Sequence, residues 1–172
     1  MGELDHLWAG WRSAYIERAT SQPGRAGGGA EGCVMCRLAA TPLDDEEAGV
    51  IWRGRGVTVA LNAYPYTSGH AMVLPDRHVG ELDALDPGES VALWEAVVHT
   101  VRAVKTAYSP GGVNVGANLG HAAGAGVPDH LHVHVVPRWA ADTNFMTTVA
   151  MARVLPEALS VSWHKLRQAW PA

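Results

Sequence analysis

Apolar residues recur along the first third of the chain, at helical spacing and then at strand spacing. Residues 3–19 carry one apolar face at helical spacing and predict an N-terminal helix, and the glycine-rich run 21–32 predicts a loop. Residues 33–40 predict a short helix or turn. Two short apolar runs, 50–53 and 57–61, flank a glycine-containing turn, so they predict a β-hairpin.

A third strand, a long helix and a fourth strand follow in the sequence. The third strand is predicted over 70–74. Asp86 and Glu89 have the spacing of a capping box, which predicts a helix start, and Ser109 begins the Ser-Pro-Gly-Gly run that ends the helix. The fourth strand is predicted over 113–118. The expected apolar face of the helix comprises Val91, Trp94, Val97, Val98, Val101 and Val104.

The last part of the chain predicts a fifth strand over 130–136, after a small-residue loop over 119–129, and a C-terminal helix over 156–170. Three strands, a helix and two further strands form an order that is typical of an antiparallel α+β sheet rather than of βαβ units. The sequence contains neither an internal repeat nor a domain boundary, so we expect a single domain over 1–172.

Composition narrows the class of protein. The 172 residues are 48% hydrophobic and 17% charged, against a usual charged share of about 25%. The net charge is −4 without a basic cluster, so we expect no nucleic acid polymer as a partner. No apolar stretch approaches the roughly 20 residues of a membrane span, the N-terminus lacks a secretory leader, and two cysteines cannot build a disulfide framework. We therefore expect a soluble cytoplasmic protein. Its low share of charged residues indicates that a partner subunit covers part of its apolar surface.

Three histidines alternate with apolar residues along the predicted fifth strand. Because side chains on a strand alternate between faces, His130, His132 and His134 share one face. Such a set favours one of two chemistries: the imidazoles bind a metal, or one neutral imidazole attacks phosphorus while its neighbours orient it. The loop just upstream, with Gly124 and Gly126, lets backbone N–H groups approach phosphate oxygens, which favours the second chemistry.

The run 130–136 has the pattern that defines the histidine triad family, His-φ-His-φ-His-φ-φ, where φ is apolar. Residues 61–78 resemble the family's earlier block, an Asn-x-x-Pro-x-x-x-Gly-His followed by Pro-x-x-His. Residues 136–146 resemble the branch of diadenosine tetraphosphate hydrolases and phosphorylases. The resemblance covers about 33–146, and it leaves 1–32, a helix and Gly-rich loop, and 147–172, a helical extension, without a family signature.

The resemblance implies a histidine triad fold, which is a five-stranded antiparallel sheet with a long helix packed on it, usually as a homodimer. The helical spacing at both ends of the chain adds N- and C-terminal helical segments to this fold. It also implies an enzyme that cleaves dinucleoside polyphosphates such as diadenosine tetraphosphate. In that reaction His132 would be the nucleophile and form a nucleotidyl intermediate, which water or inorganic phosphate then cleaves. His134 and the backbone amides near Gly124 and Gly126 would stabilise the phosphate oxygens.

Further residues match family positions that contact the nucleotide or a metal. Asn62 matches a ribose contact, Asn118 matches a polar position near the phosphates, and Trp139 is expected to wall the base pocket. The family also implies a structural zinc ion, and its expected ligands are Cys33, Cys36, His78 and His130. Such a site would be closed and tetrahedral, so it would brace His130 rather than catalyse.

Alternatives stay open at this stage. A nucleotide-binding protein with little turnover would need the same pocket, a nucleoside phosphoramidase would use the same nucleophile, and a metalloenzyme would place its ion on all three triad histidines. One departure from the family pattern leaves open whether the acceptor is water or phosphate. Many relatives carry Gln and Ser or Thr just before the triad, whereas this chain has Gly126-Val127-Pro128-Asp129.

Overall fold

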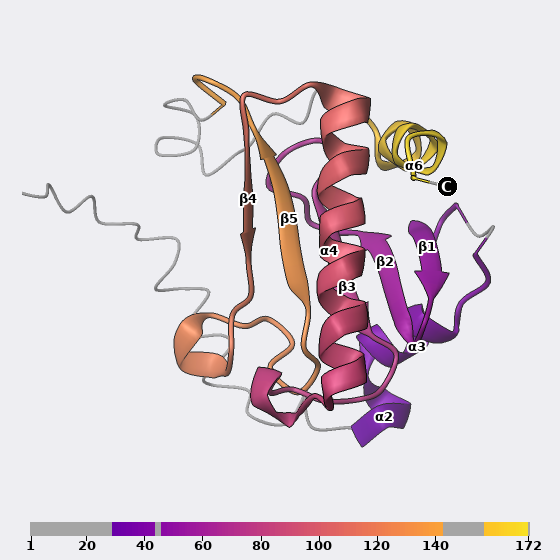
Figure 1. The fold of residues 1–172 in the computed structure, drawn as a ribbon, viewed down its shortest axis with the longest axis vertical. Coiled ribbons are helices and arrows are strands. Elements are labelled where there is room, and N and C mark those ends of the chain that lie inside the picture. The colour runs from indigo at the N-terminus through magenta and orange to yellow at the C-terminus, as the bar shows by residue number, and fades with distance from the viewer. Residues whose placement is uncertain (1–28, 44–45, 143–156, 172) are drawn as a thin grey trace, which may run out of the picture.

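The computed structural model describes residues 29–43, 46–142 and 157–171. One antiparallel sheet has the strand order β1-β2-β3-β5-β4, and the long helix α4 lies across one of its faces (Figure 1). The predicted α+β architecture, with five antiparallel strands and a packed helix, is therefore confirmed. The strands are β1 (Val50–Gly54), β2 (Val57–Leu61), β3 (Ala71–Pro75), β4 (Gly112–Gly116) and β5 (Val133–Arg138). The α-helices are α2 (Gly29–Gly32), α3 (Val34–Ala40), α4 (Pro87–Tyr108) and α6 (Leu159–Gln168), and η1 (Leu82–Ala84) and η2 (His121–Ala123) are 3-10 turns.

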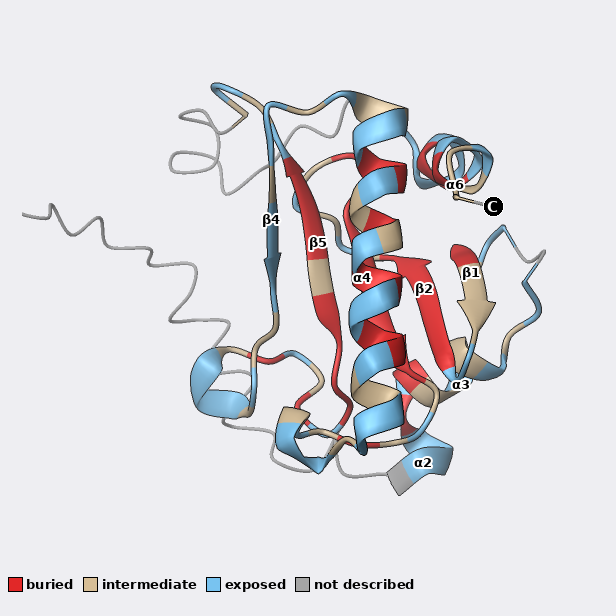
Figure 2. Ribbon diagram, in the orientation of Figure 1, coloured by how far each residue is buried: buried red, intermediate tan, exposed pale blue. Residues whose placement is uncertain are grey.

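The sheet is buried at its centre and exposed at one edge (Figure 2). All residues of β2 and β3 are buried, whereas β4 is mostly exposed and, among the strands of the described ranges, pairs only with β5. The predicted β1–β2 hairpin is present, and its two turn residues, Arg55 and Gly56, have φ values of 54° and 75°. Positive φ at both positions matches the twist of the flanking strands, which is why a glycine stands there.

The capping box at the start of α4 forms as predicted. The Glu89 N–H donates to Asp86 Oδ1 at 2.8 Å, and the Asp86 N–H donates to Glu89 Oε2 at 3.0 Å. Arg77 also pairs with Glu89 at 2.6 Å, which ties the segment after β3 to the start of this helix. The helix ends at Tyr108, and the next residue, Ser109, has a left-handed φ of 44° and donates its backbone N–H to the Lys105 carbonyl. Local hydrogen bonding thus fixes both ends of α4.

The predicted buried face of α4 is partly wrong. Val97 and Val104 are buried, but Val91, Trp94 and Val98 are 52%, 45% and 47% exposed. The helix has two apolar stripes, and the sheet covers the one that is rich in small residues, because alanines let the helix approach closely. The buried stripe comprises Ala92, Leu93, Ala96, Val97, Thr100, Ala103 and Val104.

The C-terminal helix α6 confirms the helix predicted within 156–170 and packs against α4 and β1. Its side chains Trp163 and Leu166 are buried, and the Trp163 indole N–H donates to the Val50 carbonyl at 2.8 Å. Trp170 stacks on Trp52 with ring centroids 5.3 Å apart. Within the described ranges, no helix combines the length and the apolar character that crossing a bilayer requires.

Other boundaries differ from the predictions. The helix expected over 3–19 lies outside the described residues, and the loop expected over 21–32 is wrong at its end, where α2 forms. The fifth strand begins at Val133 rather than at residue 130. Its pairing with β3 stops at Val73, and the Leu131 N–H instead donates to the carbonyl of Val79, in the loop beyond β3.

Candidate functional site

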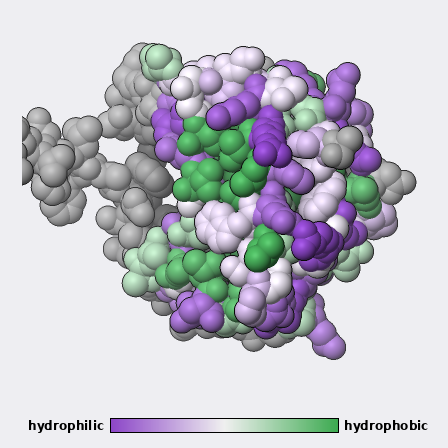
Figure 3. Space-filling model, viewed as in Figure 1, coloured by the Kyte–Doolittle hydropathy of each residue, from purple (hydrophilic) through white to green (hydrophobic). Residues whose placement is uncertain are grey.

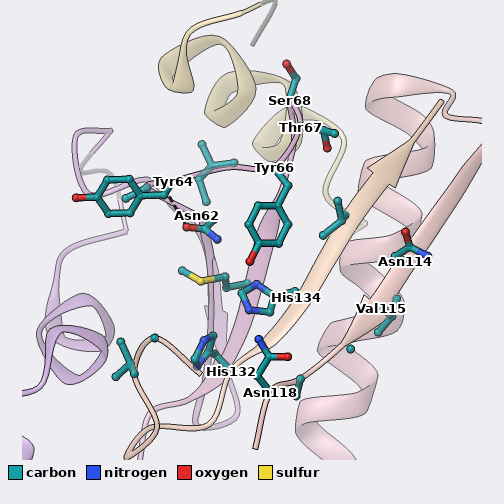
Figure 4. Close-up of a pocket in the computed structure, with 18 of the residues that line it drawn as sticks. Asn62, Tyr64, Tyr66, Thr67, Ser68, Asn114, Val115, Asn118, His132 and His134 are labelled. Atoms are coloured by element: carbon teal, nitrogen blue, oxygen red, sulfur yellow. Dashed lines mark hydrogen bonds between the residues drawn. The ribbon is translucent and has the colours of Figure 1, made fainter. Parts of the chain in front are cut away.

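A cavity of 1610 Å³ lies beside the triad histidines. Leu131, Val133 and Val135 pack in the core with α4, so the alternating side chains of His132 and His134 point to the other face of the sheet. Figure 4 shows both imidazoles at one end of the pocket, close to Asn118. Of the predicted nucleotide contacts, the structure brings Asn62, Asn118, Gly124, Gly126 and Trp139 to the wall of the same cavity.

One hydrogen bond determines which nitrogen of His132 is free. His132 Nδ1 lies 2.8 Å from the carbonyl oxygen of His130. A carbonyl only accepts, so Nδ1 carries the hydrogen and Nε2 carries the lone pair. The side chain lines the cavity although the residue is only 6% exposed. His132 therefore has the tautomer that a nucleophile attacking through Nε2 needs.

A chain of three groups determines the tautomer of His134. The Tyr66 backbone N–H donates to His70 Nδ1 at 3.1 Å, so the His70 hydrogen is on Nε2. His70 Nε2 lies 2.9 Å from His134 Nδ1 and donates to it, which leaves the His134 hydrogen on Nε2. Burial lowers the pKa of His134 to about 4, and the nearby His132 adds to this effect. His134 is thus neutral near pH 7 and holds an N–H donor beside His132, with the two ring centroids 5.0 Å apart.

His70 is a residue of this chain of hydrogen bonds to which the sequence analysis gave no role. The residue belongs to the Gly-His of the earlier family block. The structure buries it completely and places it against both Tyr66, with ring centroids 4.7 Å apart, and His134. The Gly-His motif draws attention to His70, but its partner His134 is 64 positions away in the sequence, so their contact becomes visible only in the fold.

The predicted nucleotide contacts differ in how they are held. Asn62 Oδ1 accepts the Tyr64 N–H at 2.9 Å, and its Nδ2 lies 3.4 Å from both ring nitrogens of His70. Asn118 Nδ2 lies 3.5 Å from the carbonyl oxygen of Gly124, a residue with a φ of 87° that follows η2. The left-handed conformation at Gly124 favours glycine and turns this loop towards the triad.

Trp139 comes directly after β5. Its backbone N–H donates to Asp142 Oδ2 at 3.1 Å, and its ring meets the Tyr108 ring edge-on with centroids 6.2 Å apart. The residues beyond Asp142 that share the resemblance, Asn144, Phe145 and Met146, lie outside the described residues.

The four predicted metal ligands come together at the start of α3. The candidate ligand atoms of Cys33, Cys36, His78 and His130 all lie within 4.8 Å of one another. His130 Nδ1 is 3.4 Å from each cysteine sulfur, and His78 Nδ1 is 3.3 Å from Cys36 Sγ. Tetrahedral zinc with bond lengths of about 2.3 Å to sulfur and 2.0 Å to nitrogen would separate these atoms by roughly 3.5 Å. The donor set and its spacing therefore fit a closed metal site.

The hydrogen bond made by Nε2 of His130 leaves its Nδ1 free to bind a metal. His130 Nε2 donates to the Pro75 carbonyl at 2.8 Å, so Nδ1 presents a lone pair to the thiols. Burial lowers the pKa of His130 and raises the pKa of the Cys36 thiol. The triad is consequently divided, because His130 faces the cysteines whereas His132 and His134 face the cavity. A metal ion held by all three triad histidines does not fit this arrangement.

Comparisons with known proteins agree with this geometry. A family model described as HIT domain matches residues 45–141. The chain is similar to the AP-4-A phosphorylase of Mycobacterium tuberculosis, with 38% identity over 98% of this chain and 85% of that protein. It is also similar to the asymmetrical bis(5'-nucleosyl)-tetraphosphatase of Schizosaccharomyces pombe, with 34% identity over 54% of this chain and 50% of that protein.

A solved structure, that of a Zn-bound histidine triad family protein from Mycobacterium smegmatis, superposes with a TM-score of 0.62. The two chains are 30% identical, and the match covers 82% of this chain and 94% of the other. The fold, the divided histidine triad and the match to more than half of the chain lead to one conclusion: this chain belongs to the HIT domain family.

Proposed function

We propose that the protein is an enzyme that cleaves dinucleoside polyphosphates by transferring a nucleotidyl group to His132. The observation that carries the proposal is the bond between His132 Nδ1 and the His130 carbonyl, which leaves Nε2 as the nucleophilic atom on the cavity wall. Support also comes from the likeness to an AP-4-A phosphorylase and to a bis(5'-nucleosyl)-tetraphosphatase. The proposal therefore names both the substrate class and the nucleophile.

The first step forms a bond between His132 Nε2 and the α-phosphorus and breaks the bond from that phosphorus to the bridging oxygen. For diadenosine tetraphosphate the leaving group is ATP, and the intermediate is adenylyl-His132. Negative charge gathers on the phosphoryl oxygens during this step, and the His134 Nε2–H is the donor placed to stabilise it. In the second step an acceptor oxygen attacks the phosphorus and returns the electron pair to His132 Nε2.

The acceptor we favour is inorganic phosphate, which yields ADP, rather than water, which yields AMP. Where many relatives carry Gln and Ser or Thr, this chain has Gly126-Val127-Pro128-Asp129, so fewer polar side chains reach the phosphates and the loop offers backbone N–H groups and open space. The likeness to the phosphorylase at 38% identity supports the same choice. The amides near Gly124 and Gly126, together with Asn118, would hold the phosphates in both steps.

Two further residues would contact the rest of the nucleotide. Asn62 lies at the base of the cavity beside His70, where its amide is available to the ribose. Trp139 adds an aromatic wall for a base. Neither assignment affects the phosphorus chemistry, so their loss should raise KM more than it lowers kcat.

A structural zinc ion is the metal that the cysteine–histidine cluster would hold. When bound, the ion would link Cys33 and Cys36 on the α3 segment to His78 and His130. Because the His130 carbonyl orients His132, a tether on the His130 side chain also restrains the nucleophile. The zinc bound by the similar protein from Mycobacterium smegmatis supports this choice of metal.

A homodimer and a cytoplasmic location complete the proposal. Val91, Trp94 and Val98 form an exposed apolar face on α4, and β4 is an edge of the sheet with no strand on its outer side among the described residues. Figure 3 shows hydrophobic side chains gathered on the side of the molecule that carries α4. A second copy that covers both features would bury the apolar face and pair the strand edge.

Product analysis tests the function. Purified protein is incubated with diadenosine tetraphosphate, with and without inorganic phosphate, beside the variants His132→Ala and His99→Ala. We expect sustained production of ATP and ADP only when phosphate is present, full activity in the matched control His99→Ala, and none in His132→Ala. Binding without turnover would indicate a nucleotide-binding protein, and preferential cleavage of an adenosine phosphoramidate would indicate a phosphoramidase.

A further inference from the structure

A buried hydroxyl group on the cavity wall lacks a hydrogen-bond partner in the part of the chain that the structure describes. Ser68 is 8% exposed and lines the cavity, and its Oγ finds no partner among the described residues. Figure 4 shows its oxygen directed away from the two histidines, at the end of the view where the α6 ribbon passes. Leaving such a group unpaired costs about 1–3 kcal/mol. Its position on a cavity wall points to a ligand that supplies the partner.

A polar cluster adjoins this hydroxyl. Gly69, the next residue, packs so closely on Tyr108 that a Cβ atom there would lie 2.5 Å from a ring carbon. The Tyr108 hydroxyl donates to Glu157 Oε1 at 2.5 Å, and Lys165 Nζ donates to Glu157 Oε2 at 2.5 Å. Tyr108, Glu157 and Lys165 all line the cavity that contains His132. Tyr108 at the end of α4, Glu157 just before α6 and Lys165 in the last turn of α6 therefore build the wall beside Ser68.

The charges at this end of the cavity are balanced. Lys165 pairs with Glu157, and Arg138 makes two bonds to Asp142 at 2.6 and 2.7 Å. Paired cations attract a polyphosphate weakly, because each carboxylate offsets the positive charge beside it. The Tyr108 ring completes the lining, with Lys165 Nζ 5.1 Å from the ring centroid. Hydroxyl, ammonium and aromatic groups with little net charge suit a nucleoside.

We infer that Ser68, Tyr108 and Lys165 bind the nucleoside of the leaving nucleotide. The inference rests on the proposed function: with the reacting phosphorus at His132, the polyphosphate chain crosses the cavity and carries its second nucleoside to α6. This helix lies outside the residues that match the HIT domain, 45–141. Helix α6 thus sets a preference for dinucleoside over mononucleoside polyphosphates.

Two probes that differ only in the second nucleoside test the inference. Diadenosine tetraphosphate and adenosine 5'-tetraphosphate share the reacting phosphorus and the chain of four phosphates. The ratio of their kcat/KM values is measured for the wild type, Ser68→Ala and Lys165→Met. Lys105→Met is the matched control, because Lys105 is the other lysine of the chain and does not line the cavity.

We expect the ratio to fall about 3- to 10-fold in Ser68→Ala and in Lys165→Met, the effect of one lost hydrogen bond, and to stay at the wild-type value in Lys105→Met. Ser68→Ala should also leave the melting temperature unchanged or raised, since it removes an unpaired buried hydroxyl. Equal losses on both probes would leave the ratio unchanged and overturn the inference in favour of phosphate binding. Unchanged kcat/KM values on both probes would overturn it outright. A wild type that cleaves neither probe would instead overturn the proposed function, and the inference with it.

Discussion

The contact between His70 and His134 predicts different outcomes for two amide substitutions at position 70. In His70→Gln, the amide nitrogen of the side chain takes the place of Nε2 and still donates to His134 Nδ1. In His70→Asn, the shorter amide takes the place of Nδ1, keeps the Tyr66 N–H and leaves His134 Nδ1 without its donor. The two variants therefore separate the catalytic contact from the structural one.

The magnitudes follow from the bonds that each variant removes. His70→Asn loses one buried hydrogen bond, worth about 0.5–1.5 kcal/mol, and leaves the His134 acceptor unpaired, which costs about 1–3 kcal/mol. The free energy of unfolding should thus fall by roughly 2–4 kcal/mol out of a typical 5–15 kcal/mol, so the variant still folds. Without its donor, His134 no longer presents a fixed N–H to the phosphoryl oxygens, and losing such a donor costs about 100-fold in kcat.

Steady-state kinetics on diadenosine tetraphosphate, with urea unfolding of the same preparations, checks both quantities. We expect His70→Gln to keep kcat within about 10-fold of the wild type and His70→Asn to lose about 100-fold. If the two variants lose the same activity, or if His70→Gln is the weaker enzyme, His70 does not set the proton of His134 and the reasoning is refuted.

Three other predictions concern the metal, the pH and the subunit contact. Cys36→Ser should show no bound zinc in elemental analysis and should have a lower melting temperature and a lower kcat. His132→Ala should keep its zinc, and a loss of zinc in this variant would contradict the division of the triad. Burial lowers the pKa of His134 in the folded protein below the ordinary 6.5. Between about pH 6.5 and 4 the unfolded state therefore binds more protons than the folded state. The free energy of unfolding should consequently fall as the pH falls through this window. Denaturant titrations should show a shallower fall in His134→Gln, and an equal slope would argue against the burial of this imidazole. Trp94→Glu should convert the proposed homodimer to a monomer in analytical ultracentrifugation, and a variant that stays dimeric would place the interface elsewhere.

Sequence patterns predicted the features of this fold that depend on neighbouring residues. The start of α4 is one such feature, because Asp86 and Glu89 satisfy each other's backbone donors three positions apart. The β1–β2 hairpin is another, since the turn residues alone determine the backbone twist. The ligand set Cys33, Cys36, His78 and His130 followed from the family resemblance, and the structure brings the four residues together.

Sequence patterns did not predict the features that depend on contacts between residues far apart in the sequence. Helix α4 carries two apolar stripes, and only packing on the sheet decides that Val91 and Trp94 are left exposed. The fifth strand begins late because Leu131 bonds to Val79 rather than to a strand neighbour. The role of His70 stayed hidden for the same reason, since its partner comes from another strand of the sheet.

The central claim is that His132 Nε2 carries the nucleotidyl group during turnover. Rapid acid-free quenching of the wild type with diadenosine tetraphosphate, in the absence of inorganic phosphate, followed by intact-mass analysis, tests it most directly. The account predicts one added adenylyl group per chain, located on His132 by fragmentation and missing in His132→Gly. Undiminished turnover by His132→Gly, or an adduct located on another residue, would contradict the account.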